Sequence, residues 1–166
     1  IQELYAAIIK NEARNAALAA DAVRLVQEGR SPILLTERKE HAAQLAVLLE
    51  GQVKNVFLLI GSDKPKEKRE KLAALQAIPS GEQVVVVATG KYIGEGFDAP
   101  RLDTLLLAMP ISWRGTLAQY AGRLHRSYES KREVRIYDYV DVHIPMLERM
   151  YHKRLRGYAE LGYQVK

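Results

Sequence analysis

The six residues Gln83-Val-Val-Val-Val-Ala88 decide the fold of this chain. The run is almost purely β-branched, so an extended backbone here presents apolar side chains on both sides. This pattern is typical of a strand that is buried on both faces of a parallel sheet. The run therefore predicts a sheet that is covered by other elements on each face.

Strand and helix patterns alternate on either side of this run. Short apolar segments predict further strands at residues 31–36, 55–60, 103–108 and 134–140. Helices are predicted at residues 3–27 (as one or two helices), 37–50, 64–78, 116–126 and 143–161. This order is that of an α/β domain in which helices flank a mostly parallel central sheet. We expect residues 1–166 to form one domain, with a helical segment at 1–29 and a last helix at 143–166.

Composition narrows the class of protein. Hydrophobic residues make up 48% of the chain and charged residues 27%, which are values of a soluble globular protein. The formal charge of +5 mildly favours an anionic partner. The chain has no Cys, which excludes disulfides and thiolate metal sites, and its longest apolar run is too short to cross a bilayer. We expect a cytoplasmic protein without membrane contact, and the start at Ile1 without a Met suggests a fragment of a longer chain.

Candidate binding residues follow the strands, because ligands collect at the carboxyl ends of strands in open parallel sheets. This rule places four segments at a common edge: 36–38, 61–63, 89–100 and the turn that precedes the helix at 116. The segment 89–100 is the richest of them. It contains three glycines, a hydroxyl directly after the strand, and the carboxylate of Asp98.

Other kinds of site find little support. Gly94, Gly96 and Ala99 match the dinucleotide pattern G-x-G-x-x-A, but the pattern does not begin at the end of the strand, and Pro100 then leads towards another strand. No P-loop sequence G-x-x-x-x-G-K-[ST] occurs anywhere. The four histidines show no metal-ligand spacing, so we expect no metal site.

A pair of arginines stands out near residue 120. If this stretch is helical, Gln119, Gly122, Arg123 and Arg126 lie on one face, because they are spaced i, i+3, i+4 and i+7. Paired arginines suit a polyanion such as a triphosphate, since each guanidinium donates several charge-assisted hydrogen bonds. Taken alone, the same face could be a solvated surface. Thr116 and Gln119 also have the spacing of a capping box, so Gln119 could have a structural role at the start of the helix instead of a binding role.

Together these segments resemble the second RecA-like domain of superfamily 2 helicases and translocases. Ile33-Leu-Leu-Thr-Glu-Arg38 resembles motif IV of that family, and Ala88-Thr-Gly90 with Gly94-Glu-Gly-Phe-Asp98 resembles motif V. Gln119…Gly122-Arg123…Arg126 is similar to motif VI in its Q-x-x-G-R-x-x-R form. The resemblance implies a three-layer RecA-like domain, and it covers roughly residues 30 to 140. The form of motif V is closer to the DNA-acting branches, which implies DNA rather than RNA as the partner.

The resemblance also implies how the domain takes part in catalysis. ATP lies between two RecA-like domains, and the N-terminal one, absent from this sequence, carries the P-loop and holds Mg²⁺. Arg123 and Arg126 would reach across to the γ-phosphate, with Arg126 as the arginine finger that stabilises charge in the transition state. Asp98 would bind the ribose or nucleotide edge, unless it is only a turn residue. The residues implied to approach the nucleotide are Gly94, Gly96, Asp98 and Gln119.

A second set of residues is implied to contact the backbone of the nucleic acid. Thr89 and Gly90 would touch a phosphate from the end of the strand, and Thr36 and Arg38 would make similar contacts. A nucleic-acid-binding module without motor activity remains an alternative, because of the net charge and the basic segment at 149–156. A dinucleotide-binding enzyme domain is a further alternative.

Overall fold

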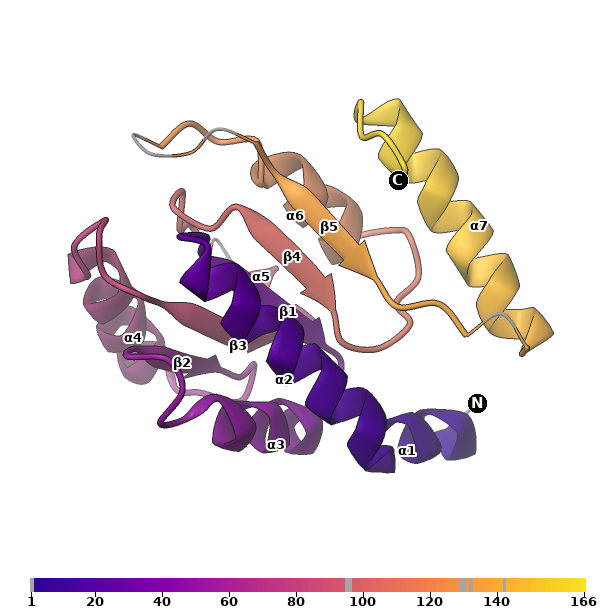
Figure 1. Ribbon diagram of the computed structural model, residues 1–166, viewed down its shortest axis with the longest axis horizontal. Helices are drawn as coiled ribbons and strands as arrows, with labels where there is room; N and C mark the ends of the chain where they lie inside the picture. Colours follow the sequence, from indigo (N-terminus) through magenta and orange to yellow (C-terminus); the bar gives the residue numbers. More distant parts are fainter. Residues whose placement is uncertain (1, 95–96, 129–130, 132, 142) are drawn as a thin grey trace.

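A parallel sheet forms the centre of the molecule (Figure 1). The computed structural model describes residues 2–94, 97–128, 131, 133–141 and 143–166. Within these residues five strands form one sheet in the order β2-β3-β1-β4-β5, and every neighbouring pair is parallel. The expected α/β class is therefore confirmed, with a sheet that is parallel throughout. The strands are β1 (Pro32–Thr36), β2 (Val56–Leu59), β3 (Val85–Thr89), β4 (Thr104–Leu107) and β5 (Arg135–Asp138).

The β-branched run lies in the interior of this sheet, between β2 and β1. Val85 and Val87 pack into one core cluster, whereas Val84, Val86 and Ala88 pack into a second cluster on the opposite face. All five side chains have no exposed surface. Burial on both faces is what the β-branched pattern predicts, because alternate side chains of a strand point to opposite faces.

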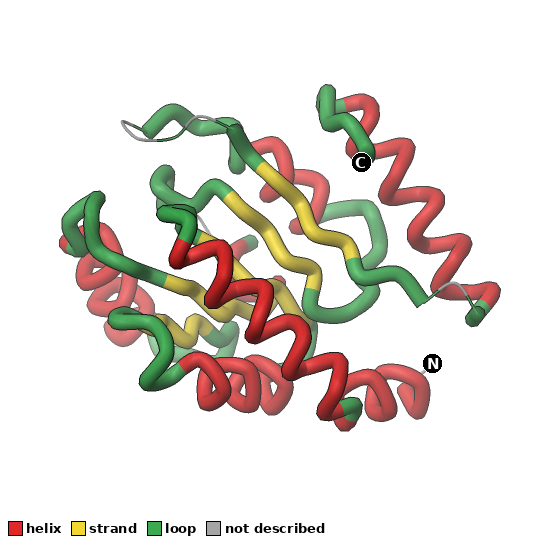
Figure 2. The backbone as a smooth tube through the Cα atoms, viewed as in Figure 1, coloured by secondary structure: helices red, strands yellow, loops and turns green. Residues whose placement is uncertain are grey.

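Helices cover both faces and make three layers (Figure 2). In Figure 1, α2 crosses in front of the sheet and α6 lies behind it. Buried residues of α2 and α3 belong to the core cluster on one face, and those of α5 and α6 belong to the cluster on the other. The helices are α1 (Gln2–Lys10), α2 (Glu12–Gln27), α3 (Lys39–Leu49), α4 (Pro65–Ala77), α5 (Gly90–Ile93), α6 (Thr116–Arg123) and α7 (Pro145–Glu160).

The N-terminal segment forms two helices rather than one. Asn11 separates them, because its side-chain oxygen accepts a hydrogen bond from the backbone N–H of Arg14 at 3.0 Å and caps α2. Ile8 of α1 nevertheless packs into the core cluster beside α5 and α6. The helix α1 is therefore attached to the domain by its own apolar side chains.

The last helix, α7, lies beyond β5 at the edge of the sheet (Figure 1). Arg154 is 1% exposed, and its Nε and Nη2 donate to the two carboxylate oxygens of Asp138 at 2.7 and 2.9 Å. Its Nη1 donates to the carbonyl oxygen of Ile111 at 2.9 Å. A buried charge of this kind needs hydrogen-bond partners, and each of the three guanidinium nitrogens of Arg154 has one. This side chain therefore joins α7 to both β5 and the β4–α6 connection.

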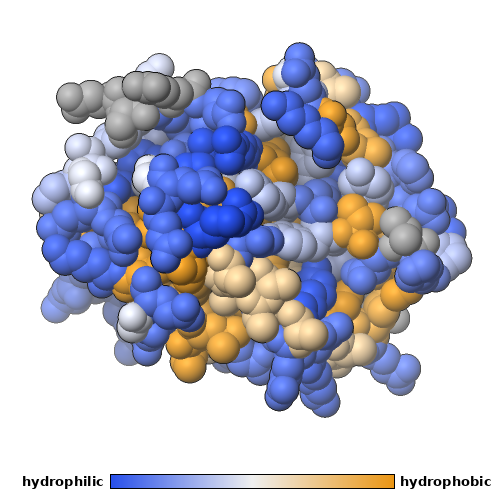
Figure 3. All heavy atoms as spheres, viewed as in Figure 1, coloured by the Kyte–Doolittle hydropathy of each residue, from blue (hydrophilic) through white to orange (hydrophobic). Residues whose placement is uncertain are grey.

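The surface seen in Figure 3 is largely hydrophilic, with apolar side chains visible between the polar ones. Among the described residues, no helix combines the length and the apolar character that a membrane crossing demands.

Candidate functional site

The structure divides the predicted site residues into two groups instead of gathering them at one edge. The segment after β3 starts at the carboxyl edge with Thr89, but β4 is parallel to β3. The chain must therefore return to the amino end of the sheet before Thr104 begins β4. Asp98 lies on this return path. The expectation that the whole segment 89–100 shares one edge is wrong, because a parallel connection has to cross the sheet.

The first group lies at the carboxyl ends of β1 and β3. Thr36 and Thr89 are neighbours in the register of these two strands. The hydroxyl of Thr89 accepts a hydrogen bond from the backbone N–H of Gly61 at 2.8 Å, so the end of β2 joins the group. A Cβ atom on the buried Gly90 would lie 3.2 Å from the carboxylate oxygen Oε1 of Glu37. The backbones of three strand ends are thus held close together.

Thr36 is fully buried and belongs to a polar network. Its Oγ1 lies 2.9 Å from Nδ1 of His41, and Nε2 of His41 lies 2.9 Å from Oδ1 of Asn15. The amide Nδ2 of Asn15 donates to the carbonyl oxygen of Ile9 at 2.8 Å, so Oδ1 must accept from His41. Burial lowers the pKa of His41 to about 4, with the charge of Arg14 as the next cause. His41 is therefore a neutral ring that donates from Nε2 and accepts the Thr36 hydroxyl proton at Nδ1.

Arg38 lies next to this network and is partly covered by α1. Its Nη2 donates to the side-chain oxygen of Gln2, and its Nη1 lies 3.9 Å from a carboxylate oxygen of Glu40. The side chain of Arg38 is 29% exposed. Of the four residues predicted for nucleic-acid contact, Arg38 thus offers a partly accessible charge, while the side chains of Thr36 and Thr89 are buried.

The second group forms where α6 meets the return path from α5 to β4. Nη1 of Arg123 donates to the carbonyl oxygens of Phe97 at 3.1 Å and Ile93 at 3.4 Å. Nη1 of Arg126 donates to Oδ1 of Asp98 at 2.8 Å, and both side chains are substantially exposed. A small hollow of about 10 Å³ is lined by residues of this group. Asp98, Arg123 and Arg126, which the motifs single out, are therefore brought together in space.

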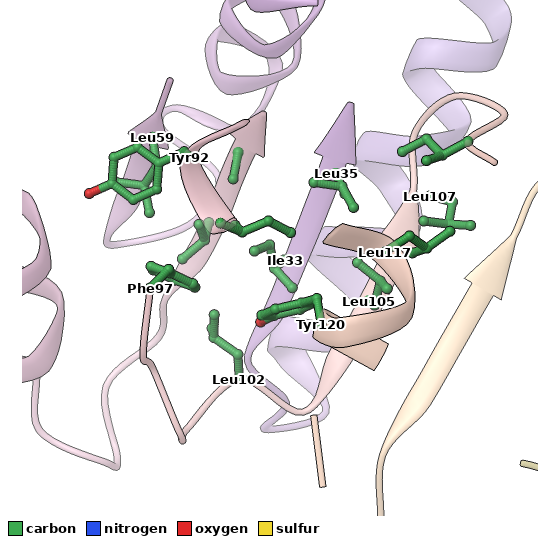
Figure 4. Close-up of a cluster of buried hydrophobic side chains, with 14 of the residues drawn as sticks. Ile33, Leu35, Leu59, Tyr92, Phe97, Leu102, Leu105, Leu107, Leu117 and Tyr120 are labelled. Atoms are coloured by element: carbon green, nitrogen blue, oxygen red, sulfur yellow. The ribbon is translucent and has the colours of Figure 1, made fainter. Parts of the chain in front are cut away.

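The apolar side of α6 fixes this arrangement. Leu117, Ala121 and Leu124 are buried, as their spacing predicts, and Tyr120 is 5% exposed. The ring of Tyr120 lies 6.2 Å from that of Phe97. In Figure 4, Phe97, Leu102 and Tyr120 surround Ile33, away from Leu35 near the carboxyl end of β1. Packing of α6 on Phe97 therefore places the arginines over this loop.

Two local expectations about α6 are wrong. The helix has Gly115 as its N-cap, with φ 54°, so Thr116 does not take the N-cap position that a capping box requires. A positive φ favours Gly at this turn. The helix also ends at Arg123 rather than continuing to Arg126. The backbone N–H groups of His125 and Arg126 bond three residues back instead, to Gly122 at 3.3 Å and Arg123 at 3.0 Å, which tightens the chain into a turn.

The other residues predicted for nucleotide contact are more dispersed. Gln119 is exposed on α6. Gly94 is exposed and ends α5 in a helical conformation, with φ −77°, so it does not open a helix as a dinucleotide fingerprint should. Gly96 lies outside the described residues. The nucleotide role of these residues stays a prediction.

The side chains of this second group suit an anion better than a cation. Two arginines and one carboxylate line the small hollow, and that carboxylate is already paired with Arg126. Among the described residues there is no cluster of three or more His, Asp or Glu side chains that could hold a metal ion. Phosphate oxygens fit these donors, whereas Mg²⁺ finds no set of oxygen ligands here.

A larger hollow lies elsewhere, between β5, α7 and the C-terminal residues. Its volume is about 750 Å³, and its wall includes Tyr137, Tyr151, Tyr158 and Tyr163. None of the residues predicted for nucleotide or nucleic-acid contact lines it. The larger hollow therefore does not coincide with the predicted site residues.

The sequence motifs missed several residues that shape the two groups. His41 and Asn15 hold Thr36 from α3 and α2, and Gln76 and Lys131 contact the loop that carries Asp98. No sequence signal marks them, because their partners are backbone groups or residues far away along the chain.

Comparison with known proteins gives one related sequence and several similar folds. No family model matches the chain. Protein 108L of invertebrate iridescent virus 3, an uncharacterized protein, is 33% identical over 99 residues, which make up 60% of this chain and 90% of the viral protein. The chain belongs to the family of protein 108L. That family membership brings no activity with it, because the viral protein is uncharacterized.

The fold is shared with the domains of helicases and related ATPases. UvsW of phage T4 matches with a TM-score of 0.77 and 20% identity over 97% of this chain. The C-terminal part of the Fun30 ATPase domain matches with a TM-score of 0.62 and 15% identity over 78% of this chain. Domain 2 of the DEAD-box helicase Mss116p, bound to an RNA duplex, matches with a TM-score of 0.62 and 14% identity over 86% of this chain. The chain therefore shares the RecA-like fold of these helicase and ATPase domains, as the motifs predict. It spans 35%, 40% and 56% of those three chains respectively.

Proposed function

We propose that this chain is the C-terminal RecA-like domain of an ATP-dependent motor that acts on nucleic acid. One observation carries the proposal: Arg123 and Arg126 lie together over the loop that contains Asp98. Nη1 of Arg123 lies 3.1 Å from the carbonyl oxygen of Phe97, and Nη1 of Arg126 lies 2.8 Å from Oδ1 of Asp98. These are the arginines and the carboxylate of motifs VI and V. The likeness to the C-terminal part of the Fun30 ATPase domain and to domain 2 of Mss116p supports a C-terminal position.

Each residue of this group has a role in the proposal. Arg126 donates to the γ-phosphate of ATP as the arginine finger, and Arg123 fixes the loop and adds positive charge. Asp98 and Gln119 contact the nucleotide, and Gly94 and Gly96 let its backbone approach. Mg²⁺ and the other phosphate contacts belong to an N-terminal RecA-like domain of the same parent chain. Two observations support this division: the sequence has no P-loop, and the described residues contain no cluster of three or more metal-binding side chains.

Nucleic acid binds at the other group, at the carboxyl ends of β1 and β3. Gly90 and Thr89 offer backbone N–H groups to a phosphate, and Arg38 offers a guanidinium. Thr36 acts through its backbone, since its side chain is buried and bonded to His41. The form of motif V favours DNA over RNA. Arg38 must leave Gln2 if its Nη2 is to bind a phosphate.

The test is the effect of Arg126→Ala in the parent protein. We expect nucleic-acid-stimulated ATP hydrolysis to fall by about 10³-fold, because an arginine finger is worth roughly that much in rate. Nucleic-acid affinity should stay within a few-fold, because Arg126 lies away from the carboxyl-edge group. Arg24→Ala is the matched control, since Arg24 is an exposed arginine on α2, paired with Asp21 and Glu28. Undiminished hydrolysis by the Arg126→Ala protein would refute the motor role.

A second function is favoured by one feature of α7. Arg149, Lys153 and Arg156 are exposed on successive turns of this helix, so it presents a basic stripe. A nucleic-acid-binding module without motor activity would use these residues. In that case Arg149→Ala and Arg156→Ala would weaken DNA binding and lower its dependence on salt, and no nucleotide would be hydrolysed. If the parent protein hydrolyses ATP and Arg126→Ala abolishes this hydrolysis, the alternative is wrong.

A further inference from the structure

The loop that carries Asp98 is held by hydrogen bonds to its backbone. Residues 97–100 belong to no helix or strand, so their carbonyl groups have no partners from regular secondary structure. Each carbonyl nevertheless accepts a bond, and three of the four donors are side chains from other parts of the chain. The donors are Arg123 Nη1 to Phe97 at 3.1 Å, Gln76 Nε2 to Asp98 at 3.1 Å, the N–H of Leu102 to Ala99 at 3.1 Å, and Lys131 Nζ to Pro100 at 2.8 Å.

Lys131 differs from the other donors because it also contacts the arginine-finger segment. Its ammonium donates to the carbonyl oxygen of Arg126 at 2.7 Å as well as to that of Pro100. The residue is half-buried, and burial lowers the pKa of its ammonium. A partly buried cation that bonds two carbonyl oxygens joins two backbone segments, and it lies outside all three motifs.

Arg126 is thereby attached to the loop at two points. Its guanidinium bonds the side chain of Asp98, and its carbonyl oxygen is joined through Lys131 to Pro100. The first contact is an exposed ion pair, with side chains 55% and 43% exposed, and such pairs contribute little by themselves. The helix α6 ends at Arg123 and supports Arg126 through one backbone bond, from the N–H of Arg126 to the carbonyl oxygen of Arg123 at 3.0 Å. Lys131 is therefore the contact that joins the backbone carbonyl of Arg126 to the Asp98 loop.

We propose that Lys131 is a positioning residue for Arg126, which sets where its guanidinium lies when ATP is bound. The proposal rests on the proposed function, since it assumes that Arg126 is the arginine finger. Small displacements of a catalytic group are costly, and about 1 Å can lower a rate by roughly 10²-fold. Loss of the backbone attachment should thus slow hydrolysis without weakening the binding of ATP.

The experiment compares variants of the parent protein by steady-state ATP hydrolysis. For Lys131→Met we expect kcat to fall by about 10-fold to 100-fold, with KM for ATP within about twofold. Lys131→Arg keeps a long cationic donor, so its kcat should return to within about threefold of the unmodified protein. Lys54→Met is the matched control, because Lys54 is an exposed lysine that pairs with Glu82 before β2. It should leave both constants unchanged.

The double variant separates positioning from a general structural effect. In an Arg126→Lys background, which keeps a residual rate, Lys131→Met should cause little further loss, because both changes act through one group. If Lys131→Met lowered kcat by the same factor in both backgrounds, the proposal would be overturned. If Lys131→Met lowers the melting temperature enough to unfold the protein, Lys131→Gln replaces it, because the Gln side chain is too short to reach both carbonyls. The same changes in kcat and KM are then expected for Lys131→Gln.

The outcomes also separate this proposal from the proposed function. If Arg126→Ala abolishes hydrolysis while Lys131→Met keeps kcat within twofold, the positioning role is wrong and the motor role stands. If Arg126→Ala hydrolyses ATP normally, the motor role itself is wrong.

Discussion

At the scale of single residues, the buried polar network around His41 has the clearest physical consequence. The ring is fully buried between Thr36 of β1 and Asn15 of α2. Both of its nitrogens already have partners that suit the neutral form. A second ring proton would place a positive charge in the buried interior, with the guanidinium of Arg14 nearby, which is why the pKa of His41 is low.

This network predicts how stability depends on pH. The pKa of His41 is about 4 in the folded chain, below its ordinary value of 6.5, so the unfolded state binds more protons between these values. The stabilising contribution is complete above pH 6.5 and is lost as pH falls towards 4. The loss should reach about 3 kcal/mol, at about 1.4 kcal/mol for each pKa unit. Urea unfolding of the chain at several pH values measures it.

A substitution isolates the histidine from the carboxylates that titrate in the same range. His41→Gln should be less stable than the unmodified chain at pH 7, but its free energy of unfolding should vary less between pH 6.5 and 4. His152→Gln, at an exposed position on α7, should keep the original slope. An unchanged slope in the His41→Gln chain would contradict the assignment.

At the scale of elements, the packing of α7 depends on a glycine beneath a tryptophan. Trp113 lies against Gly157, and its ring also meets that of Tyr158 edge-on, with centroids 5.2 Å apart. A Cβ atom at residue 157 would lie 1.9 Å from Cε2 of Trp113, which is far inside contact distance. Trp113 therefore serves as packing between α7 and the β4–α6 connection, and only Gly lets the helix approach so closely.

Gly157→Ala should separate α7 from Trp113 and destabilise the chain. We expect a loss of about 1–3 kcal/mol, the usual effect of forcing an extra atom into a packed contact. The matched change is Gly122→Ala in α6, where nothing lies within 4 Å of the added Cβ. That variant should gain about 0.5–1 kcal/mol from helix propensity. Urea midpoints of the two variants measure the difference, and equal midpoints would show that α7 does not pack as described.

At the scale of the whole molecule, the proposed function gives this domain half of a catalytic site. The arginine group supplies donors for phosphate, but no cluster of metal ligands lies among the described residues and no P-loop occurs in the sequence. The carboxyl-edge group is a separate surface, so nucleotide and nucleic acid would meet different parts of the same sheet. Coupling between them would pass through the loop that runs from Thr89 to Thr104.

The 166-residue chain alone should therefore bind ATP weakly and not hydrolyse it. A phosphate-release measurement with and without DNA should give the background rate, because nothing in the chain replaces the P-loop of the proposed first domain. Joining the chain to that first domain should restore hydrolysis. Measurable ATP hydrolysis by the isolated chain that disappears in Arg126→Ala would contradict the division of the site between two domains.

The sequence by itself determined the class of fold and the motifs. Alternation of β-branched runs with amphipathic segments is a local signal, and burial on both faces follows from it, as the valines of β3 show. The order of the three motifs likewise singled out Arg123, Arg126 and Asp98.

Only the tertiary structure decided how those residues are arranged. The end of α6 at Arg123 and the crossing of residues 97–103 away from the carboxyl edge follow from the assembly of the sheet and its helices. The bonds from Lys131 to Pro100 and from His41 to Asn15 join segments that are distant along the chain. Sequence periodicity does not report such contacts, because each is formed by groups that come together only when the sheet has assembled.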